Sequence, residues 1–155
     1  MRAYADTSFL VKLLVREAGT EKAMGEYRRL ELPRLFLLPL HRLEAANAIR
    51  QRAFHERRSA SGRQRSSIAR ERDVALARLD HWSARGWLIE ADGDWDDAIQ
   101  RAHALSARHT ERLGCRGFDL MHVAFALALE SEVFLTADRV QGMLARAEGL
   151  PVVVC

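Results

Sequence analysis

Four acidic side chains stand where apolar segments meet helix starts, or alone within an apolar helical segment. They are Asp6, Glu44, Asp119 and Asp138. Asp6 and Asp138 follow short apolar runs, and Asp119 opens a strongly apolar segment. Glu44 lies among small apolar neighbours, where an unpaired buried charge would be costly. Each has a simple structural interpretation, because an aspartate caps a helix and a glutamate can point to water. Four acids at such places favour a shared site.

Several carboxylates held together cannot all stay ionised without a cation. Oxygen ligands of this kind suit Mg²⁺ or Mn²⁺ better than Zn²⁺. If the four acids converge, they predict a Mg²⁺ site, with Mn²⁺ as a substitute and with Asp6 and Asp119 as the strongest ligand candidates. His122, one helical turn after Asp119, is interpreted first as a hydrogen-bonded structural residue, with a metal or substrate contact as the alternative.

Other chemistries find little support in the sequence. The chain has no phosphate-binding P-loop, no dinucleotide fingerprint, no nucleophile elbow and no H-E-x-x-H zinc motif. Its two cysteines, Cys115 and Cys155, form neither a disulfide framework nor a ligand pair by spacing. Cys115 has no partner that would make it a nucleophile.

Five apolar runs of strand length alternate with segments of helical periodicity. The first expected strand ends just before Asp6. The other four lie at 35–38, 86–90, 132–136 and 151–154. This alternation predicts the α/β class, with a central, mostly parallel sheet and helices on both faces. Ligands of such sheets bind beyond the carboxyl ends of the strands. The same architecture would therefore bring the four acids together.

Length and composition indicate one ordinary globular domain over residues 1–155. The chain is 48% hydrophobic and 29% charged. Its longest apolar runs, 35–40 and 121–129, fall short of the roughly 20 residues that a membrane span needs. The N-terminal residues do not follow a signal-peptide pattern. We therefore expect a cytoplasmic protein with no membrane partner.

The segment from Arg50 to Asp73 is the most biased part of the chain, with eight arginines against three acids. A turn at 59–62 predicts a basic helical hairpin at about 50–85. The apolar face of its first helix is predicted from helical spacing and comprises Leu40, Leu43, Ala46, Ala53 and Phe54, with Ile49 flanking it. The hairpin is either a solvated structural feature or a basic arm for nucleic acid or an acidic partner.

Four segments resemble the acidic motifs of PIN-domain ribonucleases. They are ADTSFLVKL at 5–13, LEAANA at 43–48, FDLMHVAFA at 118–126 and LTAD at 135–138. They stand in the family's order and extend over the whole chain. The short single-domain format resembles the VapC toxins of prokaryotic toxin–antitoxin pairs.

The resemblance implies a three-layer α/β/α PIN-like fold with a five-stranded sheet of order 3-2-1-4-5. It also implies Mg²⁺-dependent RNA cleavage, a homodimer, and a cognate antitoxin protein that covers the acidic groove. The arginine-rich hairpin is more basic than the motif pattern requires. Its assignment to RNA or to the antitoxin stays open.

The leading hypothesis is a metal-dependent endoribonuclease acting as a toxin. The carboxylates of Asp6, Glu44, Asp119 and Asp138 would hold one or two Mg²⁺ ions, and arginines of 50–72 would hold the RNA backbone. One alternative is a catalytically silent PIN-like module that binds RNA or a partner. Another is a haloacid-dehalogenase-like phosphatase, which would require a second aspartate where this chain has Ser8.

Overall fold

The computed structural model describes all residues from 1 to 155 and has the predicted α/β architecture. Five short strands form one sheet of order β3-β2-β1-β4-β5, in which every neighbouring pair is parallel. The strands are β1 (Ala3–Ala5), β2 (Leu35–Leu37), β3 (Leu88–Glu90), β4 (Val133–Thr136) and β5 (Val152–Val154). The sheet is thus wholly parallel, and its order is the one that the family resemblance implies.

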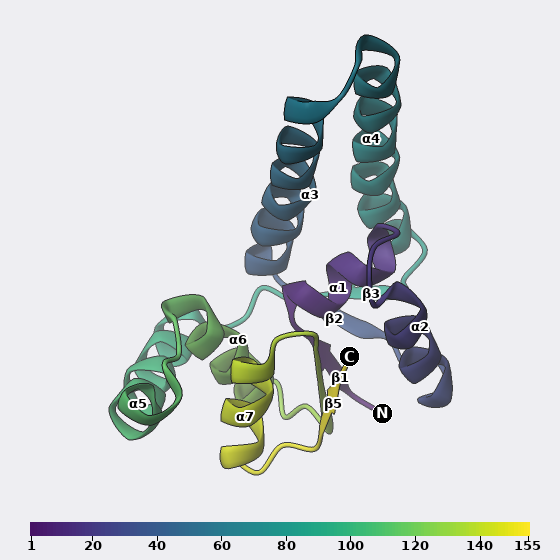
Figure 1. Ribbon diagram of the computed structural model, residues 1–155. Coiled ribbons are helices and arrows are strands. Elements are labelled where there is room, and N and C mark those ends of the chain that lie inside the picture. Colours follow the sequence, from purple (N-terminus) through teal and green to yellow (C-terminus); the bar gives the residue numbers. More distant parts are fainter.

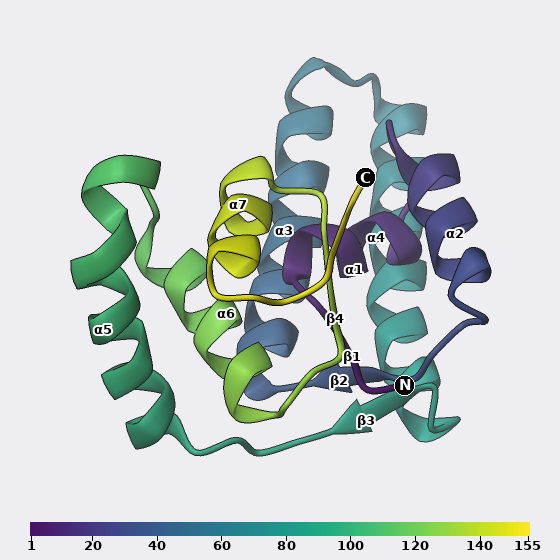
Figure 2. The ribbon, with the colours of Figure 1, turned by 90° about the horizontal axis from the view of Figure 1, so that it is seen from below.

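Helices cover both faces of this sheet, which confirms the three-layer arrangement (Figures 1 and 2). The helices are α1 (Thr7–Leu14), α2 (Thr20–Arg29), α3 (Pro39–Ser59), α4 (Gly62–Ala84), α5 (Trp95–Leu113), α6 (Gly117–Ala128) and α7 (Arg139–Ala147). The first four pack on one face, and α5, α6 and α7 pack on the other. None of these helices combines the length and the apolar character that a membrane span requires.

The central strand β1 shows how the two layers are joined. Ala3 and Ala5 face the core beneath α1–α4, whereas Tyr4 between them faces the core beneath α5–α7. All three side chains are buried. A strand with helices on both sides needs apolar residues without alternation, because each pleat face meets a core. The register aligns Ala5 with Leu135 of β4, so the carboxyl ends of these strands lie side by side.

Aspartates define where three of the helices begin. Asp6, Asp94 and Asp138 each accept a hydrogen bond from a backbone amide in the first turn of α1, α5 and α7 respectively. Helix α5 ends at Gly114, whose φ of 71° is in the left-handed region that favours glycine. Local sequence signals therefore set the element boundaries around the sheet.

The hairpin of α3 and α4 stands out from the rest of the molecule (Figure 1). The apolar face predicted for α3 is wrong in part. Leu43 is 65% exposed and Phe54 is 59% exposed. The buried stripe instead runs from His41 at four-residue intervals, and it comprises His41, Ala45, Ile49 and Ala53. The helix turns this stripe inward because small alanines permit close approach to α1 and α4.

Candidate functional site

Asp6 is fully buried at the junction of β1 and α1. Its Oδ1 accepts from the Phe9 amide at 2.9 Å, so the residue caps α1. The Ser8 hydroxyl donates to both carboxylate oxygens, at 2.8 and 2.9 Å, and the Thr136 hydroxyl donates to Oδ2 at 2.6 Å. Burial is the largest effect on this carboxyl group and raises its pKa above the usual value, although these hydrogen bonds oppose the rise. The capping role and a place in a polar cluster are therefore compatible.

Asp138 lies close to Asp6 through a shared threonine. The Asp138 amide donates to the Thr136 hydroxyl at 2.8 Å, and that hydroxyl donates to Asp6. The Asp138 carboxylate caps α7 by accepting from the amides of Val140 at 2.7 Å and Gln141 at 3.1 Å. The parallel pairing of β1 and β4 thus puts both aspartates at the same edge of the sheet.

Asp119 joins this group through helix α7. Its Oδ2 accepts from the Arg116 amide at 2.8 Å, which fixes the start of α6. Its Oδ1 accepts from the Gln141 side-chain amide at 3.1 Å. The other side-chain atom of Gln141, Oε1, is buried and has no hydrogen-bond partner. Gln141 therefore connects Asp119 to Asp138 and leaves one oxygen available to a further donor or a cation.

Glu44 approaches from helix α3 and is partly open to solvent, with 23% of its side chain exposed. Its Oε2 accepts from the Thr7 hydroxyl at 2.8 Å and lies 2.6 Å from Nε2 of buried His122. The Tyr4 hydroxyl is 2.9 Å from Nδ1 of the same ring, so Tyr4 donates there when Nε2–H donates to Glu44. Burial raises the pKa of Glu44, but the hydrogen bonds from His122 and Thr7 outweigh it and hold the pKa below 4.5.

Three of the four predicted acids are therefore linked by hydrogen bonds near the ends of β1 and β4, and Glu44 lies in an adjoining cluster with Thr7, His122 and Tyr4. Thr136 joins Asp6 to Asp138, and Gln141 joins Asp138 to Asp119. Glu44 adjoins them through Thr7, the residue after Asp6. The side chains are not gathered into a closed coordination shell, because no three His, Cys, Asp or Glu residues lie close enough to hold one metal ion.

The chemistry of the network nevertheless suits a hard divalent cation. Its donors are carboxylate, hydroxyl and amide oxygens, which Mg²⁺ and Mn²⁺ prefer. None of the four acids forms an ion pair with arginine or lysine. Glu44 has one ionisable partner, which is His122. The unpartnered Oε1 of Gln141 adds a buried oxygen without a donor. The donor set fits Mg²⁺, whereas the spacing of the carboxylates would have to tighten around it.

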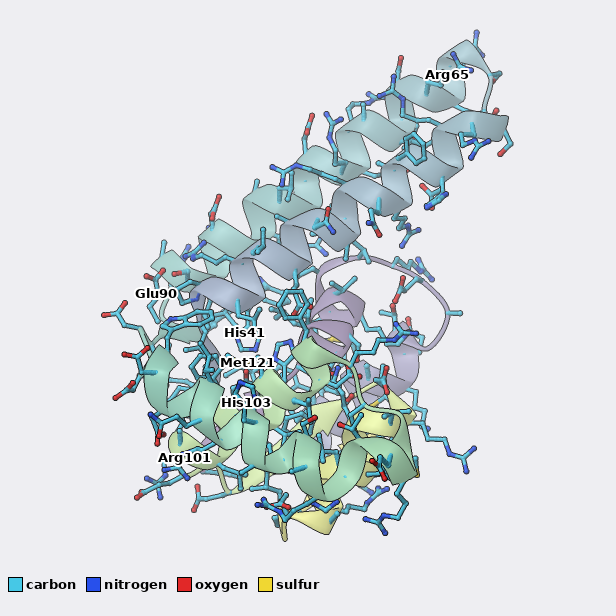
Figure 3. The ribbon with its side chains drawn as sticks, turned by 90° about the vertical axis from the view of Figure 1, so that its left-hand side faces the viewer. His41, Arg65, Glu90, Arg101, His103 and Met121 are labelled. Carbon is cyan, nitrogen blue, oxygen red and sulfur yellow. The ribbon has the colours of Figure 1, made fainter.

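Two open hollows meet beside Glu44. One of about 820 Å³ is lined by Thr7, Ser8, Glu44, Asn47, Gln51, His122 and Gln141, among others. The second, of about 650 Å³, lies between α5 and α6 and includes Asp119, Arg116, His103 and Met121. Figure 3 shows this side of the molecule, with His103 and Met121 labelled near the base of the hairpin. Arg116 is the only arginine or lysine that lines the second hollow.

Sequence reasoning identified the acids but missed much of what holds them. The hydroxyls of Thr7, Ser8 and Thr136 flank the acidic positions in the ADTS and LTAD segments, so their proximity was a usable signal. His122 is buried and hydrogen-bonded, as its structural interpretation requires, but one partner is the candidate ligand Glu44. Gln141 had no comparable signal, because its contact with Asp119 depends on how α6 and α7 pack.

In comparisons with known proteins, no family model and no curated protein sequence matches this chain. The resemblance to the PIN-domain motifs therefore rests on the four quoted segments alone.

Proposed function

We propose that the chain is a Mg²⁺-dependent endoribonuclease that acts as the toxin of a toxin–antitoxin pair. The observation that carries this proposal is the group of four carboxylates without an arginine or lysine partner near the carboxyl ends of β1 and β4. Glu44 and Asp119 line open hollows, and acids in such places suit a metal-assisted attack on a phosphodiester. The resemblance of the four motifs adds RNA as the substrate and a cognate antitoxin as the partner.

Asp6, Glu44, Asp119 and Asp138 would hold one or two Mg²⁺ ions, for which Mn²⁺ could substitute. When bound, the metal would lower the pKa of a water molecule and neutralise charge on the scissile phosphate. The described residues would prepare this site. Thr136 and Ser8 orient the Asp6 carboxylate, and Thr7 and His122 orient that of Glu44.

The charges at the site are consistent with acids that bind the metal and an arginine that binds phosphate. The lowered pKa of Glu44 keeps its carboxylate ionised near neutral pH, which favours cation binding. Arg116 is exposed beside Asp119 and forms no ion pair. Its guanidinium group could therefore hold a phosphate oxygen of the RNA. A cytoplasmic location and a homodimer complete the proposal. The location is the expectation from the sequence patterns, and the homodimer is implied by the family resemblance.

A second candidate is a catalytically silent module of the same fold that binds RNA or a protein. The absence of any three ligand side chains at metal-binding distance favours it. A haloacid-dehalogenase-like phosphatase is a poorer choice. Its first aspartate must reach substrate as a nucleophile, whereas Asp6 is fully buried and both of its oxygens accept from Ser8.

Cleavage of single-stranded RNA by the purified, antitoxin-free chain tests the proposal in Mg²⁺, in Mn²⁺ and in EDTA. Cleavage should require the metal. Asp6→Asn and Glu44→Gln should each reduce it by about 100-fold or more, since each removes a charged ligand. Asp96→Asn, at an exposed position in the first turn of α5, is the matched control and should cleave normally.

Folding must be separated from chemistry because Asp6 also caps α1. Glu44→Gln alters a partly exposed side chain and should keep the wild-type melting temperature to within a few degrees. Retention of metal-dependent cleavage by both variants would show that the carboxylates are not ligands. Absence of Mn²⁺ binding in isothermal titration of the wild-type chain would favour the silent module.

A further inference from the structure

The two faces of the α3–α4 hairpin differ in charge. On the face toward α1, a hollow of about 420 Å³ is lined by both acids and arginines. Arg52 on that face pairs with Glu56 and with Glu17. Arg72 pairs with Asp73, whereas Arg16, Arg70 and Arg78 form no ion pair, so the positive charge on this face is compensated only in part.

The other face carries uncompensated positive charge. A hollow of about 480 Å³ is lined only by Arg50, Ala53, Phe54, Arg57, Arg58, Arg65 and Arg72. Arg72 pairs with its neighbour Asp73, and the other four arginines form no ion pair. Arg65 lies near the tip of the hairpin (Figure 3). We name this surface the arginine hollow. Guanidinium groups gathered without acids repel one another, so the surface favours an anionic occupant.

Phe54 gives the arginine hollow a second chemical property. Its side chain is 59% exposed, although sequence spacing assigned it to the buried face. The Arg58 guanidinium carbon lies 5.9 Å from the centre of the ring. An exposed aromatic ring beside guanidinium groups combines a stacking surface for a base with forked donors for phosphate. An acidic peptide would use the arginines but would make no specific use of the ring.

The arginine hollow is also aligned with the acidic site. Along α3, positions spaced by three and four residues form one stripe, which comprises Glu44, Asn47, Gln51, Phe54 and Arg58. Its first three members line the 820 Å³ hollow, and the last two line the arginine hollow. The ten residues from Glu44 to Phe54 correspond to a rise of about 15 Å. At about 3.4 Å per stacked nucleotide, that distance matches about four nucleotides.

We propose that the arginine hollow binds a single-stranded RNA segment that lies about four nucleotides from the scissile phosphate. One base stacks on Phe54, and phosphates of the flanking backbone contact Arg50, Arg57, Arg58 and Arg65. The inference rests on the proposed function, since it takes the cleaved RNA as the occupant. It adds an extended substrate, read along α3, to the chemistry at the carboxylates.

The test measures binding without cleavage. Fluorescence anisotropy in EDTA follows an unstructured RNA of about 12 nucleotides, a length typical of such sites. Phe54→Ala should weaken binding by about 5- to 100-fold, whereas Phe54→Tyr should retain it. With 2-aminopurine in the RNA, stacking should quench the fluorescence in wild type and in Phe54→Tyr but not in Phe54→Ala.

Salt dependence tests the phosphate contacts. The double variant Arg58→Ala/Arg65→Ala should lower the slope of log affinity against log salt by about 1.4, because each lost phosphate contact on a single strand removes about 0.7. Arg63→Ala/Arg70→Ala removes the same charge from α4 outside the arginine hollow and should keep nearly the wild-type slope. The substituted side chains are exposed, and unchanged melting temperatures would confirm that the variants fold.

The outcomes separate this inference from the proposed function. Unchanged RNA binding in Phe54→Ala, or equal slopes for the two double variants, would overturn the inference even if the chain cleaves RNA. An acidic peptide that binds as tightly as RNA, with the same dependence on Phe54, would also overturn it and assign the surface to a protein. RNA binding that depends on Phe54 in a chain without metal-dependent cleavage would support the binding surface and refute the nuclease.

Discussion

Replacing His41 with glutamine should make the stability of the fold less sensitive to acid. His41 is fully buried in the first turn of α3. Its Nδ1 accepts from the Leu38 amide at 3.0 Å, and its Nε2 donates to the carbonyl oxygen of Ala5 at 2.8 Å. Ala5 immediately precedes Asp6, and α3 carries Glu44. The ring therefore connects the ends of β1 and β2 beneath the candidate site.

The size of the stability loss in acid follows from the pKa of the His41 ring. Burial, together with the neighbouring His122, lowers the pKa of His41 from 6.5 to about 3. Below pH 6.5 the unfolded chain binds a proton that the folded chain excludes, so stability falls as the pH falls toward 3. Between about pH 7 and pH 5 this single group should cost about 1.9 kcal/mol of unfolding free energy.

Urea unfolding of wild type and His41→Gln at about pH 7 and pH 5 measures this cost. A glutamine at the third helical position can still accept from the Leu38 amide, but it does not titrate. At pH 7 the variant should be less stable by about 1–3 kcal/mol, because the Ala5 carbonyl loses its partner. At pH 5 the gap between the two proteins should shrink by about 1.9 kcal/mol.

A matched control and a clear contrary result are available. His55→Gln removes a histidine from the exposed side of the same helix and is the control for the loss of a histidine as such. If His41→Gln loses as much stability as wild type between pH 7 and pH 5, the buried ring does not exclude the proton. The assignment of His41 as a neutral connection between β1 and β2 would then be wrong.

Two further predictions concern the layer of α5–α7. Gly93→Ala should destabilise the fold by about 1–3 kcal/mol in thermal unfolding, because φ is +69° there and an added Cβ would lie 2.7 Å from Phe125. A melting temperature equal to that of wild type would contradict this crowding. Glu148→Ala should cost about 0.5–1 kcal/mol above pH 4.5, because the carboxylate accepts from His109 at 2.6 Å and from Arg108 at 2.9 Å. These bonds outweigh burial and lower the pKa of Glu148 below 4.5, so the difference should fade as the pH falls below that value, and its persistence in strong acid would refute the pairing.

The amino-acid sequence was sufficient to predict the elements and their order. Uninterrupted apolar runs such as Leu35–Leu37 indicated strands buried on both faces, and aspartates such as Asp94 marked helix starts. These signals are local, because hydrophobic period and capping depend on residues within a turn or two. The alternation of strands and helices predicted a mostly parallel sheet, which the structure shows to be wholly parallel, and it placed Asp6 and Asp138 at the same edge.

The tertiary structure alone decided which side chains complete the site. Thr136 donates to Asp6 across 130 positions of sequence, and Gln141 reaches Asp119 only because α6 packs on α7. The packing of α3 also leaves Phe54 exposed, although its apolar spacing had predicted that it would be in the core. Sequence spacing predicts that a helix has an apolar face, but the neighbours against which it packs determine which face is buried. For that reason the acids could be read from the sequence, whereas their hydrogen-bond partners and the arginine hollow could not.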